Sequence, residues 1–417
     1  MNFLGYRCSR CSREYSPGEA TYLCPADGGN LDVVLDYDKL RTGVDPRELE
    51  TSPQRSLWRY QRLLPVENLG EERTPMGAVG WTPVYDEPAL ARELGLGQLW
   101  LKDEGRNPTG SLKDRASAVV LARAKEIAAK VVVTASTGNA GAALAGLAAA
   151  CGQRAVIFAP RGAPPAKVAQ LLIYGATVLL VEGNYDQAFD LSIETANEFG
   201  WYCRNTGYNP FTVEGKKTAA YEIWEQVLEA GASPKSGLPV PAVVVSVGDG
   251  NIISGLYKGF QDLQALGWLD RVPRLFGVQA EGSAAIANAW RQGSERIVPV
   301  AARTLADSIS VDLPRDGVRA VRAVSQSGGA CLTVSDADIL GAMADLGRVG
   351  VFAEPAAAAA HAGLKQAVRE GRLGREDRVL VIITGSGLKD VRAASQAVGK
   401  AKVIEPRLKA VKVALGL

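Results

Sequence analysis

The sequence predicts an α/β protein built on open, twisted parallel sheets. Short runs of mostly β-branched and other apolar residues lie between longer segments with helical periodicity, as in Val131–Thr134, Ala242–Val245 and Val379–Ile383. A parallel strand with both faces buried is apolar throughout rather than alternating, so these runs favour parallel strands covered by helices. At 417 residues the chain is long for a single domain, and two domains with appendages are expected.

The first 40 residues differ from the rest and predict a small zinc-ribbon-like segment. Cys8 and Cys11 form one pair, and Cys24 and Asp27 form a second pair with the same spacing. Structural zinc takes four ligands, usually sulfur or nitrogen, and aspartate is a less common substitute. Two interpretations stay open: a structural zinc site made of three cysteines and Asp27, or a metal-free remnant of such a ribbon.

Residues 41–75 are charged, with Trp58, Tyr60 and Leu63 among a few apolar anchors, and are expected to form an extended arm around the body. The body begins with Trp81–Pro83 and Leu99–Lys102. Strand-like and helix-like segments then alternate. The pairs are Val131–Thr134 with Ala140–Cys151, Ala155–Phe158 with Ala166–Tyr174, Thr177–Val181 with Ala188–Phe199, Ala242–Val245 with Ile252–Ala265, and Arg274–Val278 with Ala284–Trp290, before the last strand Val379–Ile383.

Composition narrows the class of protein. Lysine and arginine total 47 against 45 acidic residues, a net charge of +2, and no long basic stripe is present. Neither nucleic acid nor a membrane surface is therefore an expected partner. No uninterrupted apolar run is long enough to span a bilayer, and no signal peptide is recognisable. Six cysteines do not make a disulfide framework, so a cytoplasmic protein with reduced thiols is expected.

The segment Asn107–Arg115 carries the strongest functional signal. It places Lys113 between a polar, glycine-bearing loop and a segment with helical periodicity, where the amine can form a Schiff base. A single lysine is usually solvated and unreactive. Three further polar corners follow strand-like runs, however, at Ser136–Asn139, Gly248–Asn251 and Thr384–Gly387. Together with the lysine they predict a pyridoxal phosphate (PLP) site at the carboxyl ends of strands.

Two of these corners suit anions. Ser136–Asn139 opens a helix, whose unpaired N–H groups and dipole favour a carboxylate, although the same residues would also be ordinary caps. Gly248–Ile252 also joins a strand to a helix and can cradle a phosphate with main-chain amides. It does not complete the GxGxxG pattern, and Ser111 stands where a Walker motif has lysine. NAD and ATP are therefore not favoured.

The chain resembles the threonine synthase branch of the fold-type-II PLP enzymes, from its N-terminal cysteines to about Asp390. The N-terminal ribbon, Asp103–Gly110 and Gly385–Asp390 carry this likeness. The resemblance implies a large PLP-binding domain, residues 76–120 and 205–395, and a small substrate-side domain, residues 121–204. A tail, residues 396–417, follows. It also implies a homodimer acting on a small amino-acid substrate.

The resemblance further assigns roles to residues. Lys113 would hold PLP and move protons, and Asn139 would contact the phenolic oxygen of the cofactor. Thr384 would meet the pyridine nitrogen, where a hydroxyl favours elimination and replacement over transamination. The phosphate would be held by Gly248, Asp249, Gly250, Asn251 and Ile252. The substrate would be bound by Ser136, Thr137, Gly138, Asn205, Thr206 and Thr212.

Three positions depart from the family pattern. Thr212 stands in place of an arginine, Asp249 in place of an asparagine, and Ser386 in place of a histidine. The loss of a cation and the gain of an anion disfavour a dianionic phosphate ester such as O-phosphohomoserine. An altered leaving-group pocket is therefore predicted, with Lys216 or Arg204 as candidates to supply the missing positive charge.

The predicted function is PLP-dependent elimination or replacement on an amino acid, of the threonine synthase type. Within the same class, a threonine or serine dehydratase or a β-replacement synthase remains an alternative. A non-catalytic homologue that binds an amino acid is the alternative from another class, and the presence of Lys113 argues against it. His361, the single histidine, lies in an alanine-rich helical segment and is expected to pack rather than to react.

Overall fold

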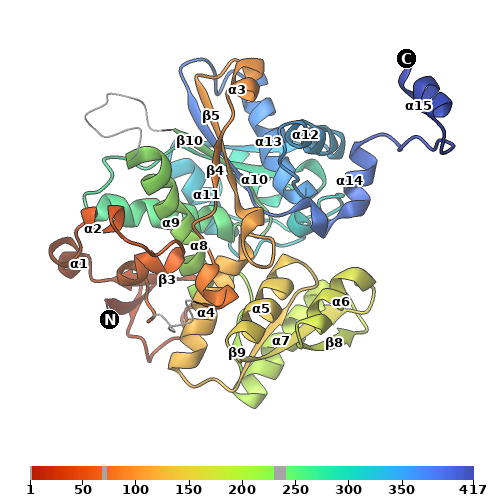
Figure 1. Cartoon of the computed structure of the whole chain (residues 1–417). Helices are drawn as coiled ribbons and strands as arrows, with labels where there is room; N and C mark the ends of the chain where they lie inside the picture. Colours follow the sequence, from red (N-terminus) through yellow and green to blue (C-terminus); the bar gives the residue numbers. More distant parts are fainter. Residues whose placement is uncertain (1, 68–72, 230–240) are drawn as a thin grey trace.

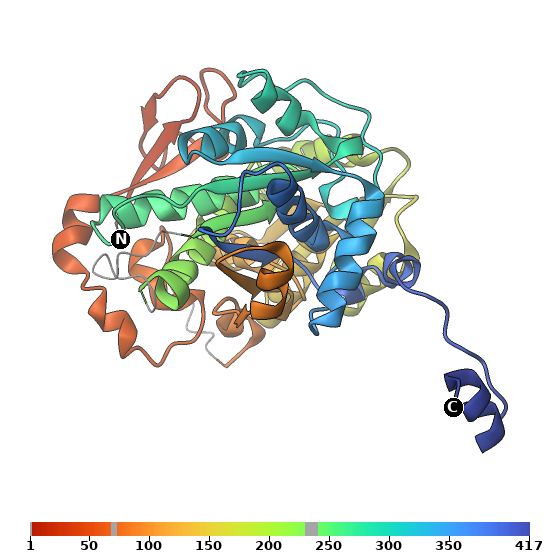
Figure 2. The same cartoon turned by 90° about the horizontal axis from the view of Figure 1, so that it is seen from above.

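The computed structural model describes residues 2–67, 73–229 and 241–417 and contains three sheets (Figures 1 and 2). The largest has six strands in the order β12-β11-β10-β13-β5-β4. All neighbours in it run parallel except β4, which pairs antiparallel with β5 at the edge. Its strands are β4 (Val84–Asp86), β5 (Gln98–Asp103), β10 (Ala242–Ser246), β11 (Leu275–Ala280), β12 (Ala330–Val334) and β13 (Arg378–Ile383).

Helices cover both faces of this sheet, which confirms the α/β class with buried parallel strands. Val243 and Val245 pack into one apolar cluster, whereas Val244 between them packs into another on the opposite face. Such alternation on a continuous apolar strand is the pattern of a sheet buried on both sides. The helices of this part are α3 (Pro88–Leu94), α9 (Asn251–Ala265), α10 (Ala285–Arg291), α11 (Gly317–Gln326), α12 (Asp336–Arg348) and α13 (Pro355–Arg369).

A second, four-stranded sheet has the order β8-β7-β6-β9 and is entirely parallel. Its strands are β6 (Val131–Ala135), β7 (Arg154–Pro160), β8 (Thr177–Val181) and β9 (Tyr202–Cys203), and its helices are α5 (Asn139–Ala150), α6 (Pro165–Ile173) and α7 (Tyr185–Phe199). Figure 1 shows this group mainly in yellow, beside the part that holds the six-stranded sheet, whose strands β4 and β5 are orange and whose other strands lie in the green-to-blue part of the chain. The sheet lies within residues 121–204, the segment expected as the small domain.

Two helices connect these parts. α4 (Lys113–Glu126) and α8 (Phe211–Ile223) pack against each other, and α8 also packs along α9. Glycines allow the close approach: a Cβ at Gly215 would lie 2.0 Å from the carbonyl oxygen of Arg115, and one at Gly259 would lie 2.4 Å from that of Lys217. Every residue of α8 is buried, so this helix is the centre of the fold.

The third sheet is the N-terminal ribbon, with antiparallel strands β1 (Phe3–Cys8), β2 (Glu14–Tyr15) and β3 (Leu31–Leu35). The segment that follows was expected to be an extended arm, but it contains α1 (Tyr37–Gly43), α2 (Arg47–Glu50) and a 3-10 helix, Leu57–Leu63. Its apolar anchors Trp58 and Tyr60 are buried. Side-chain caps from Asp36 and Ser56 help to explain why helical turns form in a segment of such mixed composition.

The chain ends with α14 (Val391–Ala397) and α15 (Leu408–Leu415). Both views show α15 standing away from the rest of the protein, and none of its residues is buried. Within the residues that the structure describes, each helix is too short or too polar to cross a membrane.

Candidate active site

The carboxyl ends of strands from both parallel sheets meet at one cavity of about 440 Å³. Residues 134–140 reach it from the end of β6 and the start of α5, residues 246–253 from the end of β10, and Thr384 from the end of β13. Arg204 and Thr206 line it from the end of β9. The edge of the sheets at which ligands are expected in α/β proteins is therefore the edge where the predicted corners gather.

Lys113 lines this cavity from the first turn of α4. The preceding residue is fixed by a hydrogen bond of 2.9 Å from Leu112 N–H to the carbonyl oxygen of Thr384, and Ser111 forms a bridge with Gly385. Burial lowers the pKa of the Lys113 amine, and the carboxylate of Glu354 opposes this shift. A lysine with a lowered pKa is neutral more of the time, which is the state needed for nucleophilic or basic chemistry.

The N-terminus of α5 also opens onto the cavity, through Ser136, Thr137, Gly138 and Asn139. The Ser136 hydroxyl accepts a hydrogen bond of 3.2 Å from Gly138 N–H. The Asn139 side chain donates to both carboxylate oxygens of Glu354, at 2.8 and 3.0 Å. The first N–H groups of a helix lack partners within it, so this corner can bind a carboxylate.

The glycine loop lies at the N-terminus of the 15-residue helix α9. Gly250 has φ = +93°, and a Cβ there would lie 2.7 Å from the carbonyl oxygen of Asp316. The loop is also held by a hydrogen bond of 2.9 Å from Asp316 N–H to the carbonyl oxygen of Asp249. Only glycine fits this position without strain, and the resulting loop presents main-chain amides at a helix N-terminus, as phosphate sites do.

Ionisable side chains complete the lining, with Arg204 and Lys216 as basic groups and Asp249, Asp307 and Glu354 as acidic groups. Burial is the main cause of each pKa shift: it lowers the pKa of Arg204 to about 10, lowers that of Lys216 well below its usual value, and raises that of Asp249. The Arg204 Nη2 atom is buried and has no hydrogen-bond partner among the described residues. A ligand anion would satisfy it.

Comparison with known proteins identifies the family. Residues 76–385 match the family of pyridoxal-phosphate dependent enzymes. The threonine synthase of Methanocaldococcus jannaschii is 38% identical over 94% of both chains, and that of Methanosarcina acetivorans is 37% identical over 98% of both. The chain belongs to the threonine synthase-like PLP enzymes. It is thus a PLP-dependent lyase of the fold-type-II class.

Solved structures show the same fold. Diaminopropionate ammonia lyase from Escherichia coli, in complex with an aminoacrylate-PLP azomethine intermediate, has a TM-score of 0.67 at 20% identity. The match covers 84% of this chain and 93% of that one. Threonine deaminase isoform 2 from Solanum lycopersicum has a TM-score of 0.66 at 21% identity, covering 86% and 90%. At such low sequence identities, the similarity to these two structures shows a shared fold only.

PLP is the cofactor of this family, and the cavity fits it. The glycine loop at Gly250 would hold the phosphate, Lys113 would supply an amine for covalent attachment, and Thr384 would present a hydroxyl to the pyridine nitrogen. The hydroxyls of Ser246 and Thr384 lie 3.4 Å apart, so Ser246 is positioned to orient Thr384.

Two residues predicted to bind substrate do not line the cavity. The Asn205 amide oxygen accepts from Ala135 N–H at 2.8 Å and from the Thr134 hydroxyl at 3.0 Å, which ties β6 to the segment after β9. The Thr212 hydroxyl donates to the carbonyl oxygen of Asn209 at 2.7 Å and is fully buried. Both side chains therefore hydrogen-bond to the segments that form the cavity wall and do not themselves line the cavity. His361 is buried on α13, away from the cavity, as expected.

Sequence reasoning missed several lining groups, among them Glu354, Tyr185 and the segment 307–311. Glu354 is the most informative, because burial raises its pKa and its carboxylate faces Asn139. The signal available was the dipeptide Glu354-Pro355 at the start of an alanine-rich helix, since proline favours the first helical turn. Nothing in the sequence linked that helix start to Asn139, which lies 215 positions earlier.

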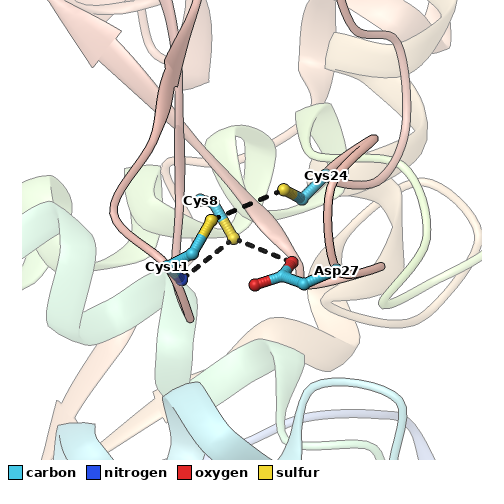
Figure 3. Close-up of side chains that lie close together, drawn as sticks. All are labelled: Cys8, Cys11, Cys24 and Asp27. Atoms are coloured by element: carbon cyan, nitrogen blue, oxygen red, sulfur yellow. Dashed lines mark hydrogen bonds between the residues drawn. The ribbon is translucent and has the colours of Figure 1, made fainter.

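The predicted metal ligands are also brought together, at the tip of the ribbon and outside the cavity. Figure 3 shows the side chains of Cys8, Cys11, Cys24 and Asp27 directed toward one another, and their ligand atoms all lie within 4.8 Å.

Proposed function

We propose that the protein is a threonine synthase that converts O-phosphohomoserine and water into threonine and inorganic phosphate. The single observation that carries this proposal is the pair of buried basic side chains, Arg204 and Lys216, in a cavity that also holds Lys113. A phosphate ester requires cationic partners, and Arg204 has an unpaired Nη2 to offer. The relatives named threonine synthase, matched over nearly the whole chain, support the same activity.

PLP, when bound, supplies an electron sink that stabilises negative charge at the substrate carbon atoms. The residues of the chain do the rest. Main-chain N–H groups at Ser136–Asn139 bind and orient the α-carboxylate. The Lys113 amine removes the α-proton and returns protons to carbon later, since burial lowers its pKa. Glu354 holds the Asn139 amide in place and faces Lys113 with a charge that moderates this pKa.

Hydrogen bonds from Arg204 and Lys216 to neighbouring side chains position both residues for the leaving phosphate. Arg204 donates to the Thr206 hydroxyl at 2.7 Å and to the Ser117 hydroxyl at 3.2 Å, which leaves Nη2 for a ligand. Lys216 donates to the Asn251 side chain beside the glycine loop. A bound dianion would favour the charged form of Lys216, so phosphate binding would be coupled to proton uptake by this amine.

Asp249 supports the second candidate function, deamination of threonine or serine. Its carboxylate lines the same cavity, and an ionised carboxylate beside a dianionic phosphate is unfavourable. Burial raises the pKa of Asp249, which reduces this conflict because the protonated form carries no charge. We therefore rank phosphate-ester chemistry first and deamination second.

The test is a direct comparison of substrates with the PLP-loaded enzyme. O-Phosphohomoserine is expected to give threonine and phosphate in equal amounts, with a kcat/KM at least about 100-fold above that for deamination of L-threonine or L-serine, since the cation pair contributes a few kcal/mol only to the phosphate ester. Efficient formation of 2-oxoacids without phosphate turnover would instead identify a dehydratase.

We also infer a cytoplasmic homodimer that takes small amino acids as substrates. All six cysteines are free thiols, which suits a reducing compartment. The apolar side chains of Leu408, Val413 and Leu415 on the projecting helix α15 are exposed, and burial against a second copy would remove them from water. Light scattering of the full chain tests this state directly.

A further inference from the structure

The tip of the N-terminal ribbon holds a compact group of four metal-binding side chains (Figure 3). Cys8 and Cys11 come from the end of β1 and the turn after it, and Cys24 and Asp27 come from the turn that precedes β3. Cys8 and Cys24 are buried, while Cys11 and Asp27 are exposed, so the group faces solvent on one side. It lies outside the catalytic cavity, and none of its members lines that cavity.

Two of the spacings between ligand atoms match tetrahedral zinc. With zinc–sulfur bonds of about 2.3 Å, two sulfur ligands lie about 3.8 Å apart, and a sulfur and an oxygen ligand lie about 3.5 Å apart. The Sγ atoms of Cys11 and Cys24 are 3.7 Å apart, and Cys8 Sγ lies 3.3 Å from Asp27 Oδ1. Both distances are close to the values for ligands of a single ion.

Groups around the cluster are arranged as an outer shell of a metal site. The N–H groups of Arg10 and Cys11 point at Cys8 Sγ at 3.3 and 3.5 Å, and the Tyr15 hydroxyl lies 3.1 Å from Cys24 Sγ. Gly29 N–H donates to Asp27 Oδ1 at 2.8 Å, and a Cβ at Gly29 would lie 2.8 Å from Cys8 Sγ. Such outer partners orient the ligands of a metal ion.

We propose that Cys8, Cys11, Cys24 and Asp27 bind one structural zinc ion, and that the zinc-bound ribbon holds two segments that support the active site. Each thiol loses its proton to solvent when it binds, so three protons leave as one Zn²⁺ enters. The aspartate completes the four ligands that structural zinc takes.

The first supported segment is residues 203–208, which carry Arg204 and Thr206 to the cavity. The Tyr22 hydroxyl, in the loop between the two ligand pairs, accepts from Cys203 N–H at 2.8 Å. Its ring stacks on Tyr208 with a centroid distance of 4.6 Å. Asn30, three residues after Asp27, donates to the carbonyl oxygen of Gly207 at 2.6 Å. The ribbon thus contacts both ends of this segment.

The second segment contains Arg315, Asp316 and Arg319. Asn30 also donates to the carbonyl oxygen of Arg315 at 3.2 Å, and Arg319 binds the Asp32 carboxylate of β3 at 2.7 Å. On its other side, this segment binds the glycine loop. Arg315 N–H donates to the Asp249 carboxylate at 3.3 Å, and Asp316 accepts from Asn251 at 2.8 Å. A chain of direct contacts therefore runs from the ribbon to the glycine loop.

Metal analysis of the purified PLP-loaded enzyme tests the site itself. About one zinc per chain is expected, as one tetrahedral site requires. Cys11→Ser changes an exposed ligand and is expected to lower the zinc content at least about tenfold, whereas Cys331→Ser, a buried cysteine far from the ribbon in sequence, is the control and should retain zinc. A wild-type enzyme that stays below about one tenth of a zinc per chain after dialysis against zinc, with free thiols or a Cys11–Cys24 disulfide, would overturn the proposal.

Hydrogen exchange tests the supporting role. Zinc is removed from the folded wild-type enzyme with a chelator, so the result does not depend on the folding of a variant. Amide exchange within residues 203–208 and 315–319 is expected to become at least about threefold faster, because local opening follows the loss of anchoring contacts. Readdition of zinc should reverse the change. Faster exchange confined to residues 2–35 would show that the metal stabilises the ribbon alone, and would overturn this part of the proposal.

Discussion

The side-chain amide of Asn139 donates to both carboxylate oxygens of Glu354, at 2.8 and 3.0 Å. The two residues begin helices from different parts of the fold: Asn139 is the first residue of α5, and Glu354 is the N-cap position of α13. Their contact joins the four-stranded part to the six-stranded part beside Lys113. It gives the cavity a buried negative charge, which is one of the influences on the Lys113 pKa.

Removing that charge should change the pH dependence of turnover. Glu354→Gln keeps an oxygen acceptor for Asn139 but loses the carboxylate that opposes the lowering of the Lys113 pKa. The pKa that limits kcat on its acidic side is therefore expected to move down, because the buried negative charge that favours the protonated amine is gone. Glu354→Asp, which keeps the charge, is the matched comparison. A pH profile unchanged in Glu354→Gln would show that Glu354 does not act on the catalytic amine.

Lys113 is expected to be the only amine that attaches PLP. Lys113→Ala should reduce turnover by at least about 10⁴-fold, because covalent attachment and proton transfer are lost together. Circular dichroism should show an unchanged fold. Borohydride reduction followed by peptide mapping should find the label on residue 113 in the wild type. Lys216→Ala is the control and should keep that label. A label retained in Lys113→Ala would identify a different carrier.

Gly250 is expected to be essential for holding the cofactor phosphate. An alanine at φ = +93° is strained, and its Cβ would lie 2.7 Å from the Asp316 carbonyl oxygen, so the loop must shift. PLP affinity should fall by at least about tenfold in Gly250→Ala, the equivalent of 1.4 kcal/mol. Gly267→Ala is the matched control, since Gly267 also has positive φ, +77°, but has open space around it. Equal PLP affinity in both variants would remove the glycine loop from the site.

The sequence predicted the site residues at strand ends and helix starts better than the charged and polar side chains that reach the cavity from elsewhere in the fold. Lys113, Ser136–Asn139, Gly248–Ile252 and Thr384 each follow or begin a regular element, so local pattern was enough to find them, and the structure brings all of them to one cavity. Glu354 and Tyr185 have no such local mark, because their roles depend on contacts between distant segments. Alignment with a family motif gave the position of Thr212 in the chain but not its contacts. Its hydroxyl donates to the Asn209 carbonyl oxygen and also lies 3.2 Å from Asn251 Oδ1 beside the cavity, and its role in substrate binding stays a prediction.

The single histidine should make the protein less stable in acid. Burial lowers the pKa of His361 to about 4. The negative charge of the neighbouring Asp345 acts in the opposite direction but is the smaller effect. The unfolded chain, with a histidine pKa near 6.5, therefore binds more protons between pH 6.5 and 4. The free energy of unfolding is therefore undiminished by His361 above pH 6.5. It decreases as the pH falls toward 4, by up to about 3 kcal/mol. Denaturant unfolding of wild type and His361→Gln at several pH values should show a smaller acid-induced loss in the variant. Parallel curves would contradict the assignment.

Arg204 should separate the use of phosphate esters from the other chemistry of the site. Its Nη2 has no partner among the described residues, and its other nitrogens are fixed by Ser117 and Thr206, so the guanidinium is held ready for an anion. Arg204→Gln is expected to lower kcat/KM for O-phosphohomoserine by about 100- to 1,000-fold, the loss of roughly 3–4 kcal/mol that a buried charged hydrogen-bond pair contributes.

Two comparisons make the Arg204 result specific. Deamination of L-threonine or L-serine, which lack a phosphate, should change by less than about threefold in Arg204→Gln, because neither makes the charged contact. Arg161→Gln is the matched control, since Arg161 is exposed and its ion pair with Glu182 lies at the surface, where such pairs contribute little. If Arg204→Gln lowers all activities equally, Arg204 supports the fold of the site rather than the leaving phosphate. Lys216, whose pKa is lowered by burial, would then be the residue that binds the leaving phosphate. In that case the KM for O-phosphohomoserine should rise with pH as the amine loses its proton, and Lys216→Arg should flatten the rise.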